Sequence, residues 1–347
     1  MGTALGLPGV AGGRRFPGFR GARQEGIVEP PPPHLAIAGF DLVTRDRHDL
    51  VWVLREWSRI ATELTASRSG RRGDEGTVTA GRRGLTVTVG FGPSLFAGDR
   101  YAIADRRPTP LVEIPAFAGD AIDPAASGGD LCVQACATDP GTAHQAIRTL
   151  LAAARSHAVL RWRQSGFQPD DGARDPRGLF GFRDGTSNLD VDNPRETARL
   201  LWVSDGPAWM HGGTFMVVRR IRMLLETWDR VAVAQQESII GRRRESTHRI
   251  GTVPHAHANL ASAARNGGIK LLRRSYTYHA GIDPNGLMDS GLIFISFQRD
   301  PHQFVAIQQR LARYDPLNAF SQHVASGVFA CPPGCPQGSW LGAELFS

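Results

Sequence analysis

The sequence lacks any long apolar segment. In 347 residues no run approaches the roughly 18 apolar residues that a membrane-spanning helix needs. The pair Arg14-Arg15 is typical of an export signal, but no apolar run of about seven or more residues follows it. We therefore expect a protein without a membrane span that is located in the cytoplasm, and export stays open for a natural chain with a longer N-terminus.

Cysteine is scarce, with four residues in two Cys-x3-Cys pairs. Such a pair could form half of a zinc site. Cys132 and Cys136 lie in an alternating apolar run, where positions four apart share a face but are too far apart to bond, so we expect buried thiols. Cys331 and Cys335 flank a Pro-Pro-Gly turn, and a disulfide between them stays open.

A concentrated basic face is also missing, although the formal net charge is +7. The positive residues occur in short clusters with acids nearby, at 71–72, 82–83, 219–220 and 242–244. Nucleic-acid binding usually requires one concentrated basic surface. We expect arginines dispersed over a solvated surface and no nucleic-acid partner.

The length and a hydrophobic content of 41% suit one large or two medium domains, and we expect two. Residues 1–33 are rich in Gly, Arg and Pro and end in four prolines, which predicts an N-terminal arm. We place an N-terminal domain at 34–167 and a C-terminal domain at 168–347.

Apolar periodicity predicts the order β-α-β-β-α-β in each half. The first half has expected strands at 35–40, 85–91, 131–137 and 159–167, and expected helices at 50–64 and 142–157. The second half has expected strands at 214–221, 269–278, 291–297 and 327–331, and expected helices at 224–240 and 301–311. This order is typical of the ferredoxin-like plait, in which two helices cover one face of an antiparallel sheet. The predicted fold class is α+β, with two such plaits.

The connection between the halves carries the segment 181–188, Gly-Phe-Arg-Asp-Gly-Thr-Ser-Asn. It places one carboxylate, Asp184, in a turn between two glycines. Gly185 has no Cβ and accepts positive φ, so the backbone can pass close to a flat ligand while Asp184 points at it. For Asp-Gly-Thr alone, an ordinary Asx-turn is the alternative. Long ordered connections are usually functional.

Further candidates follow in the second half. His255 and His257 could be a metal site with a carboxylate, two surface histidines, or one haem ligand beside a bystander. Arg273 and Arg274 lie on opposite faces of a strand, so only one can face a site, and an exposed edge strand is the alternative. Asp289 opens an apolar strand, where an acid either needs a buried partner or caps the strand.

These motifs together resemble the dye-decolorizing (DyP-type) haem peroxidases, and most closely the branch with iron-uptake-linked and actinobacterial members. The resemblance covers nearly the whole chain after residue 25, including the segments at 114–120, 161–162, 209–210, 212–213 and 340–346. It implies a dimeric α+β barrel type of fold built from two plaits. It also implies one haem b per chain, held in the C-terminal half.

The resemblance assigns roles around the haem. Asp184 is the catalytic aspartate above the iron, and its neighbours Gly185, Thr186 and Ser187 contact the cofactor. His257 is the axial ligand of the iron, because the family's proximal His precedes a Leu-Ala pair in the register found at 260–261. Asn259 stands where the family has Arg.

The same resemblance makes Arg273 the distal arginine, both catalytic and in contact with the cofactor, and leaves Arg274 to solvent or a haem propionate. Asp289 is expected to accept the Nδ1 proton of His257 from the second shell. Leu292 and Phe294 are expected to line a dry distal pocket.

The activity implied is reduction of hydrogen peroxide with oxidation of dye-like or phenolic donors. Asp184 relays a proton between the peroxide oxygens and Arg273 stabilises the charge that develops, with activity favoured at low pH. The partners are hydrogen peroxide and small aromatic reductants, and a homo-oligomer is possible. A haem carrier, or a deferrochelatase-like protein that releases iron from haem, is one alternative, and a non-haem interaction module is another.

Overall fold

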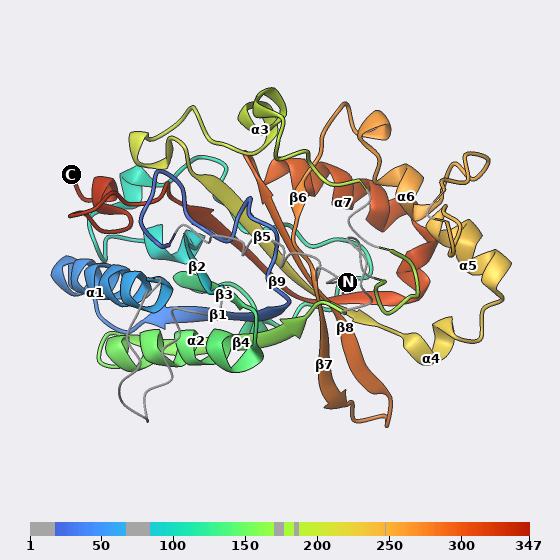
Figure 1. Ribbon diagram of the computed structural model, residues 1–347, viewed down its shortest axis with the longest axis horizontal. Helices are drawn as coiled ribbons and strands as arrows, with labels where there is room; N and C mark the ends of the chain where they lie inside the picture. The colour runs from blue at the N-terminus through green and yellow to red at the C-terminus, as the bar shows by residue number, and fades with distance from the viewer. Residues whose placement is uncertain (1–17, 67–83, 170–176, 184–186, 247) are drawn as a thin grey trace, which may run out of the picture.

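The computed structural model describes residues 18–66, 84–169, 177–183, 187–246 and 248–347. Asp184, Gly185 and Thr186 lie outside these residues. Within the described part the strands form one antiparallel sheet in the order β5-β9-β2-β3-β1-β4-β7-β8-β6, and a further pairing of β5 with β8 closes it (Figure 1). The fold is therefore a mixed α/β fold around a barrel-like antiparallel sheet.

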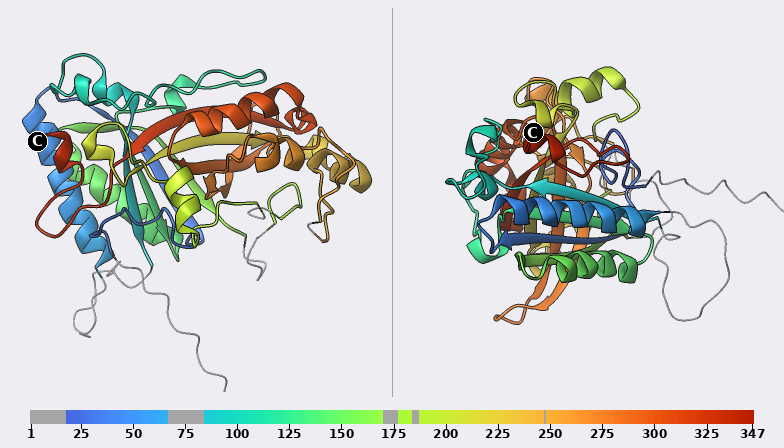
Figure 2. Two further views of the ribbon diagram at one scale, coloured as in Figure 1. Left: turned by 90° about the horizontal axis from the view of Figure 1, so that it is seen from above. Right: turned by 90° about the vertical axis from the view of Figure 1, so that its left-hand side faces the viewer.

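The first half has the elements expected from its periodicity. They are β1 (His34–Leu42), α1 (Arg47–Thr65), β2 (Thr86–Phe91), β3 (Leu131–Ala137), α2 (Pro140–Ala154) and β4 (Ala158–Phe167). Asp46 and Asp139 cap α1 and α2 by accepting bonds from backbone amides of the first turn. The two helices lie side by side (Figure 2), and Trp57 Nε1 of α1 donates to the Leu150 carbonyl of α2 at 2.9 Å.

The second half departs from expectation in two elements. Its elements are β5 (Thr214–Met223), α4 (Leu225–Trp228), α5 (Val233–Ile240), α6 (His257–Leu260), β6 (Leu272–Arg273), β7 (Tyr276–Ile282), β8 (Met288–Gln298), α7 (His302–Tyr314) and β9 (Ser321–Cys331), after α3 (Pro194–Leu200) in the connection. The single helix expected at 224–240 is two helices, because the chain turns back on itself: Gln236 Nε2 donates to the Trp228 carbonyl at 2.9 Å. The strand expected at 269–278 is interrupted between β6 and β7.

The two expected sheets are one sheet. β2 joins β9 through the pair Phe91↔Ala330, and β4 joins β7 through Phe167↔Thr277. These contacts connect strands that are far apart in the sequence, so the apolar alternation within each strand could not predict that they pair. The two edge strands of the first half, β2 and β4, therefore each pair with an outer strand of the second half, β9 and β7 respectively.

Residues 18–33, expected to belong to an arm, pack on the body of the protein. Gln24 is buried, and its Nε2 donates at 2.9 Å to the carbonyls of Val89 in β2 and Pro332 after β9. Arg274 donates to the carbonyls of Ile27 and Glu29. This segment therefore binds to both halves of the chain.

Two expectations about simple features can be compared with the described residues. All four cysteines are buried free thiols, so the disulfide left open for Cys331 and Cys335 is not formed. None of the described helices is both long and apolar enough to cross a bilayer.

Candidate functional site

A cavity of about 580 Å³ lies between the sheet and the helices of the second half. Apolar side chains form much of its wall. They include Ile221 and Met223 of β5, Leu292 and Phe294 of β8, and Phe304, Ile307 and Leu311 of α7. Strand alternation explains why these side chains share one face of the sheet. Leu292 and Phe294 are two apart on β8, and Ile221 lies opposite Leu292 on β5. Leu292 and Phe294 thus line a cavity as expected.

His257 begins the short helix α6 and faces this cavity. Helix α5 ends at Gly241 in a left-handed conformation with φ +80, and a Cβ there would lie 2.6 Å from the Cβ of Ala256. Only glycine allows this approach without displacing Ala256. The close contact between the end of α5 and the start of α6 therefore helps to fix the position of His257.

The imidazole of His257 is held by a carboxylate from another element. Its Nδ1 lies 2.6 Å from Oδ2 of Asp315, which follows α7 and whose side chain is 3% exposed. Asp315 Oδ1 accepts from the Leu317 amide at 2.9 Å, so both oxygens are used. Donation from Nδ1 fixes the tautomer that directs Nε2 to a metal.

The place expected for Asp289 is occupied by Asp315. Asp289 Oδ2 instead lies 2.6 Å from Nη2 of Arg220, and Oδ1 accepts from the Tyr278 hydroxyl at 3.1 Å. The physical reason is alternation: Asp289 is an odd number of positions from Leu292 along β8, so its side chain leaves the opposite face of the sheet. The expected contact of Asp289 with His257 was wrong.

The neighbouring histidine is placed outside the cavity. His255 is exposed, and its ring centroid lies 6.1 Å from that of Tyr314. Asn259, which stands where the family has Arg, donates through Nδ2 to the Val253 carbonyl at 2.7 Å. It ties the preceding turn to α6, so its side chain supports the helix that carries His257.

Arg273 lines the cavity from β6. The side-chain amide of Asn188 binds both backbone groups of Arg273, accepting from its N–H at 2.7 Å and donating to its carbonyl at 2.9 Å. Arg274 points the other way, as expected for alternate strand positions. It is not directed to solvent or a propionate, since it is 3% exposed and donates to backbone carbonyls of the N-terminal segment.

Close packing and hydrogen bonds fix the backbone of the segment that precedes Asp184. Gly181 has φ +82, and a Cβ there would lie 2.6 Å from a guanidinium nitrogen of Arg244. Arg177 Nη1 donates to the Gly181 and Arg244 carbonyls at 2.9 and 2.6 Å. Arg183 and Ser187, which flank residues 184–186, both line the cavity. The roles expected for Asp184, Gly185 and Thr186 themselves fall outside the described residues.

Cations gather at the cavity, a feature that the sequence did not predict. Arg242 and Arg249 donate to the Ser187 hydroxyl at 2.8 and 3.2 Å, and Arg183 and Lys270 also line the cavity. Arg242 was assigned to a dispersed surface cluster, and its position follows from the end of α5 at Gly241. No local pattern marks it as a cavity residue.

The donor set fits haem. A histidine oriented by a buried carboxylate is a usual iron ligand, the apolar wall suits a macrocycle, and the cations suit its propionates. Among the described residues no group of three or more His, Cys, Asp or Glu could hold a bare metal ion.

Comparisons with known proteins agree with this geometry. Models for the N-terminal and C-terminal parts of the Dyp-type peroxidases match residues 24–168 and 175–336. A dye-decolorizing peroxidase of Thermobifida fusca is 36% identical over 366 residues, covering 93% of this chain and 84% of the relative. A deferrochelatase of Escherichia coli O157:H7 is 29% identical over 368 residues, covering 94% and 86%.

Solved structures give the same result. Ferric DtpA from Streptomyces lividans superposes with a TM-score of 0.87 at 36% identity, over 95% of this chain and 96% of that chain. A DyP-type peroxidase from Cellulomonas bogoriensis superposes with a TM-score of 0.84, also at 36% identity, over 94% and 97%.

Proposed function

The chain belongs to the Dyp-type peroxidase family, its cofactor is haem, and we propose that the cavity beside His257 is the haem site, with one haem b per chain. The protein is a peroxidase that reduces hydrogen peroxide with electrons from reducing donors. The finer assignment, to dye-like and phenolic donors, rests on the family alone. The observation that carries the site assignment is the 2.6 Å contact between His257 and buried Asp315 at the wall of that cavity.

His257 would hold the iron through Nε2, while Asp315 accepts the proton of Nδ1. A carboxylate partner gives the imidazole more anionic character and makes it a stronger ligand. Burial of Asp315 makes this interaction stronger than it would be in water. We propose that Asp315, in place of Asp289, accepts the Nδ1 proton of His257.

On the distal side, Arg273 and Asp184 act on peroxide, and Leu292 and Phe294 exclude water. When bound, the haem would supply the redox centre for the two-electron reduction of peroxide. Asp184 accepts a proton from one peroxide oxygen and returns it to the other, while Arg273 stabilises the negative charge on the departing oxygen. Asn188 holds the Arg273 backbone from both sides, which keeps the guanidinium preorganised.

The cations at the cavity are suited to the propionates. Arg242 and Arg249, both from the segment after α5, meet at the Ser187 hydroxyl, so this segment presents positive charge beside the loop that carries Ser187. Ser187 thereby contributes to the cofactor site, and Gly185 and Thr186 are proposed to contact the cofactor on the strength of the family resemblance. Charge-assisted bonds from arginine to carboxylates are strong and directional.

We further propose that the closed sheet derives from two plaits, one in a domain at 34–167 and one in a domain at 168–347. The sheet order supports this: the first half contributes β2-β3-β1-β4, and the second half gives the corresponding β7-β8-β5-β9 when the β5–β8 pairing is followed. Each half therefore has the same neighbour relations for its first, second, third and fourth long strands.

A haem-loaded preparation tests peroxidase function against the deferrochelatase-like alternative, which the 29% identical relative keeps open. We expect peroxide to be consumed with oxidation of a phenol and with the porphyrin retaining its iron. Release of iron with an intact metal-free porphyrin, without peroxide-dependent phenol oxidation, would support the alternative. Porphyrin fluorescence measures the second outcome directly, because iron-free porphyrin is fluorescent.

A further inference from the structure

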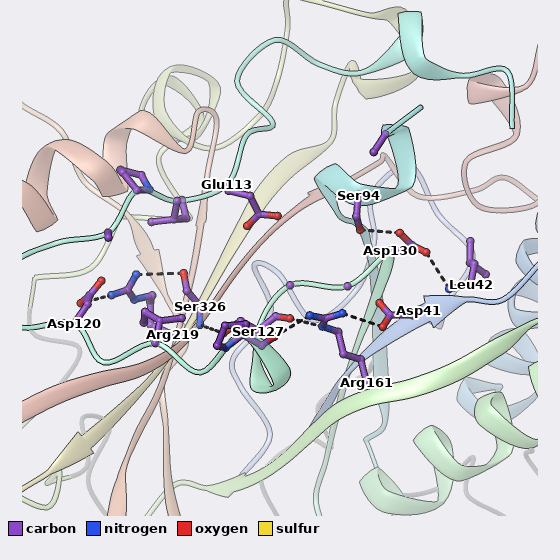
Figure 3. Close-up of a pocket in the computed structure, with 18 of the residues that line it drawn as sticks. Asp41, Leu42, Ser94, Glu113, Asp120, Ser127, Asp130, Arg161, Arg219 and Ser326 are labelled. Atoms are coloured by element: carbon purple, nitrogen blue, oxygen red, sulfur yellow. Dashed lines mark hydrogen bonds and ion pairs between the residues drawn. The ribbon is translucent and has the colours of Figure 1, made fainter. Parts of the chain in front are cut away.

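A second cavity of about 610 Å³ lies on the same face of β5 and β9 as the first cavity, further along these strands and against the first half (Figure 3). Its walls come from β1, β4, β5 and β9 and from the segments at 94–100 and 113–130. Apolar side chains such as Leu42, Ile114 and Ile122 line part of it. The proposed peroxidase function does not use this space.

The charged side chains that line this second cavity form ion pairs, with one exception. Asp41 binds Arg161 at 3.0 Å, Asp130 binds Arg100 at 2.8 Å, and Asp120 binds Arg219 at 2.7 Å. Four carboxylates and three guanidinium groups line the cavity, so ionisation of all of them leaves one negative charge.

The additional carboxylate is Glu113. It extends from its loop into the space between Arg219 and Asp130 (Figure 3). Burial raises the pKa of Glu113, while nearby Arg161 lowers it. The Glu113 side chain is exposed at the cavity, and a positive ligand group beside it would balance the one additional negative charge.

Two side chains joined by one hydrogen bond lie between this cavity and the haem site. Arg219 is 1% exposed, and its Nε donates to Nδ1 of His323 at 3.1 Å. His323 lines the haem cavity. Burial and the neighbouring Arg219 lower the pKa of His323 to about 3, so the ring is a neutral acceptor.

An aromatic contact runs beside this bond. The Arg219 guanidinium carbon lies 5.6 Å from the Phe117 ring centroid, and Phe117 lies 6.4 Å from Phe304, which lines the haem cavity. A donor held in the second cavity is therefore separated from the peroxide-reducing cavity by one layer of side chains. Such a short, packed separation suits transfer of single electrons.

We propose that the second cavity binds aromatic electron donors that carry a positive charge, with the cation beside Glu113 and the ring on the apolar wall. The inference rests on the proposed peroxidase function. Each phenolic donor loses one electron and one proton, and two donors reduce one hydrogen peroxide to two waters while forming two phenoxyl radicals. The donor's charge, rather than its ring, then distinguishes this site from an unspecific surface.

Binding is tested by calorimetry with phenyltrimethylammonium, which has the cation and the ring but no oxidisable hydroxyl. Ala116→Trp fills the cavity, and Ala118→Trp is its matched control, because both alanines are exposed on one loop and only Ala116 lines the cavity. We expect Ala116→Trp to abolish binding and Ala118→Trp to retain it. Equal affinity in both variants would overturn the site.

Turnover is tested with three phenols that share a ring: (4-hydroxyphenyl)trimethylammonium, 4-methylphenol and 4-hydroxybenzenesulfonate. We expect Glu113→Gln to lower kcat/KM for the cation relative to 4-methylphenol by about threefold to tenfold, through KM, because one charge interaction is lost. The exposed Glu344→Gln is the control and should leave the ratio unchanged.

The outcomes separate the two proposals. Absence of peroxide turnover with all three phenols contradicts the proposed function. Normal turnover with an unchanged ratio in both Glu113→Gln and Ala116→Trp contradicts the donor site alone. A wild-type preference for the sulfonate over the cation would also overturn it.

Discussion

At the residue scale, the proposed iron site depends on the contact between His257 and Asp315. We predict that Asp315→Asn retains haem but raises the ferric/ferrous potential and slows peroxide reduction by roughly 10–100-fold, because a neutral amide no longer favours the more anionic imidazole. Spectroelectrochemistry and steady-state kinetics measure these effects. Asp289→Asn is the control, since Asp289 contacts Arg220, and equal effects of the two substitutions would contradict the assignment.

In the proposed mechanism, Arg273 and Asp184 share the distal chemistry, and their contributions are separable. Losing one preorganised donor costs about 3–4 kcal/mol, and losing a general base costs roughly 10²–10⁴ in rate. We predict that Arg273→Leu slows the peroxide-dependent absorbance change at least as much as Asp184→Ala, with haem bound in both. A fast Arg273→Leu and a slow Asp184→Ala, in stopped-flow above the pKa of the aspartate, would make Asp184 the principal catalyst.

At the element scale, the join between α5 and α6 positions the iron ligand. We predict that Gly241→Ala lowers stability by at least about 1–2 kcal/mol, because a side chain is strained at φ +80 and its Cβ meets Ala256. The displaced Ala256 should also lower haem occupancy. Gly251→Ala is the control, as no atom lies within 4 Å of its Cβ position. Similar thermal unfolding and haem content in both variants would contradict this account.

Periodicity predicted most elements but not the contacts between them. The strand at 131–137 has the expected bounds, since each of its residues is buried in an apolar run. The helix expected at 224–240 is broken where buried Trp228 packs against Phe180 and Phe320, with ring centroids 4.7 and 5.0 Å away. Those partners lie far away in the sequence, and no pattern within the helix reports them.

The iron site shows the same limit. His257 was identified from the motif that follows it, and Leu292 and Phe294 from their strand. Asp315 is 58 residues from His257 and lies at the end of a helix, where an acid before proline usually signals only a cap. The motif therefore singled out His257, which we propose as the ligand, and only the folded chain showed that Asp315 contacts it.

At the scale of the whole molecule, the N-terminal segment joins the two halves and contains a buried acid. Glu25 is 2% exposed, and burial raises its pKa to about 7. Because the folded-state pKa lies above the unfolded value, Glu25 favours folding below about pH 4.5, and this contribution is lost as the pH rises toward 7.

We therefore predict that Glu25→Gln is more stable than the wild type at pH 8 and gains less or nothing at pH 4. The free energy of unfolding from urea titrations at the two pH values measures this difference. The exposed Glu344→Gln should show no such pH dependence. A wild type that exceeds Glu25→Gln by more at pH 8 than at pH 4 would contradict the sign.

The most direct test of the central claim is the absorption spectrum of protein expressed with a haem precursor, recorded before and after one equivalent of hydrogen peroxide. The account predicts a Soret band in the wild type and in His255→Ala that changes with peroxide and returns when a phenol is added. His257→Ala should lose most of the bound haem. A colourless wild type, or a colourless His255→Ala beside a normally coloured His257→Ala, would contradict it.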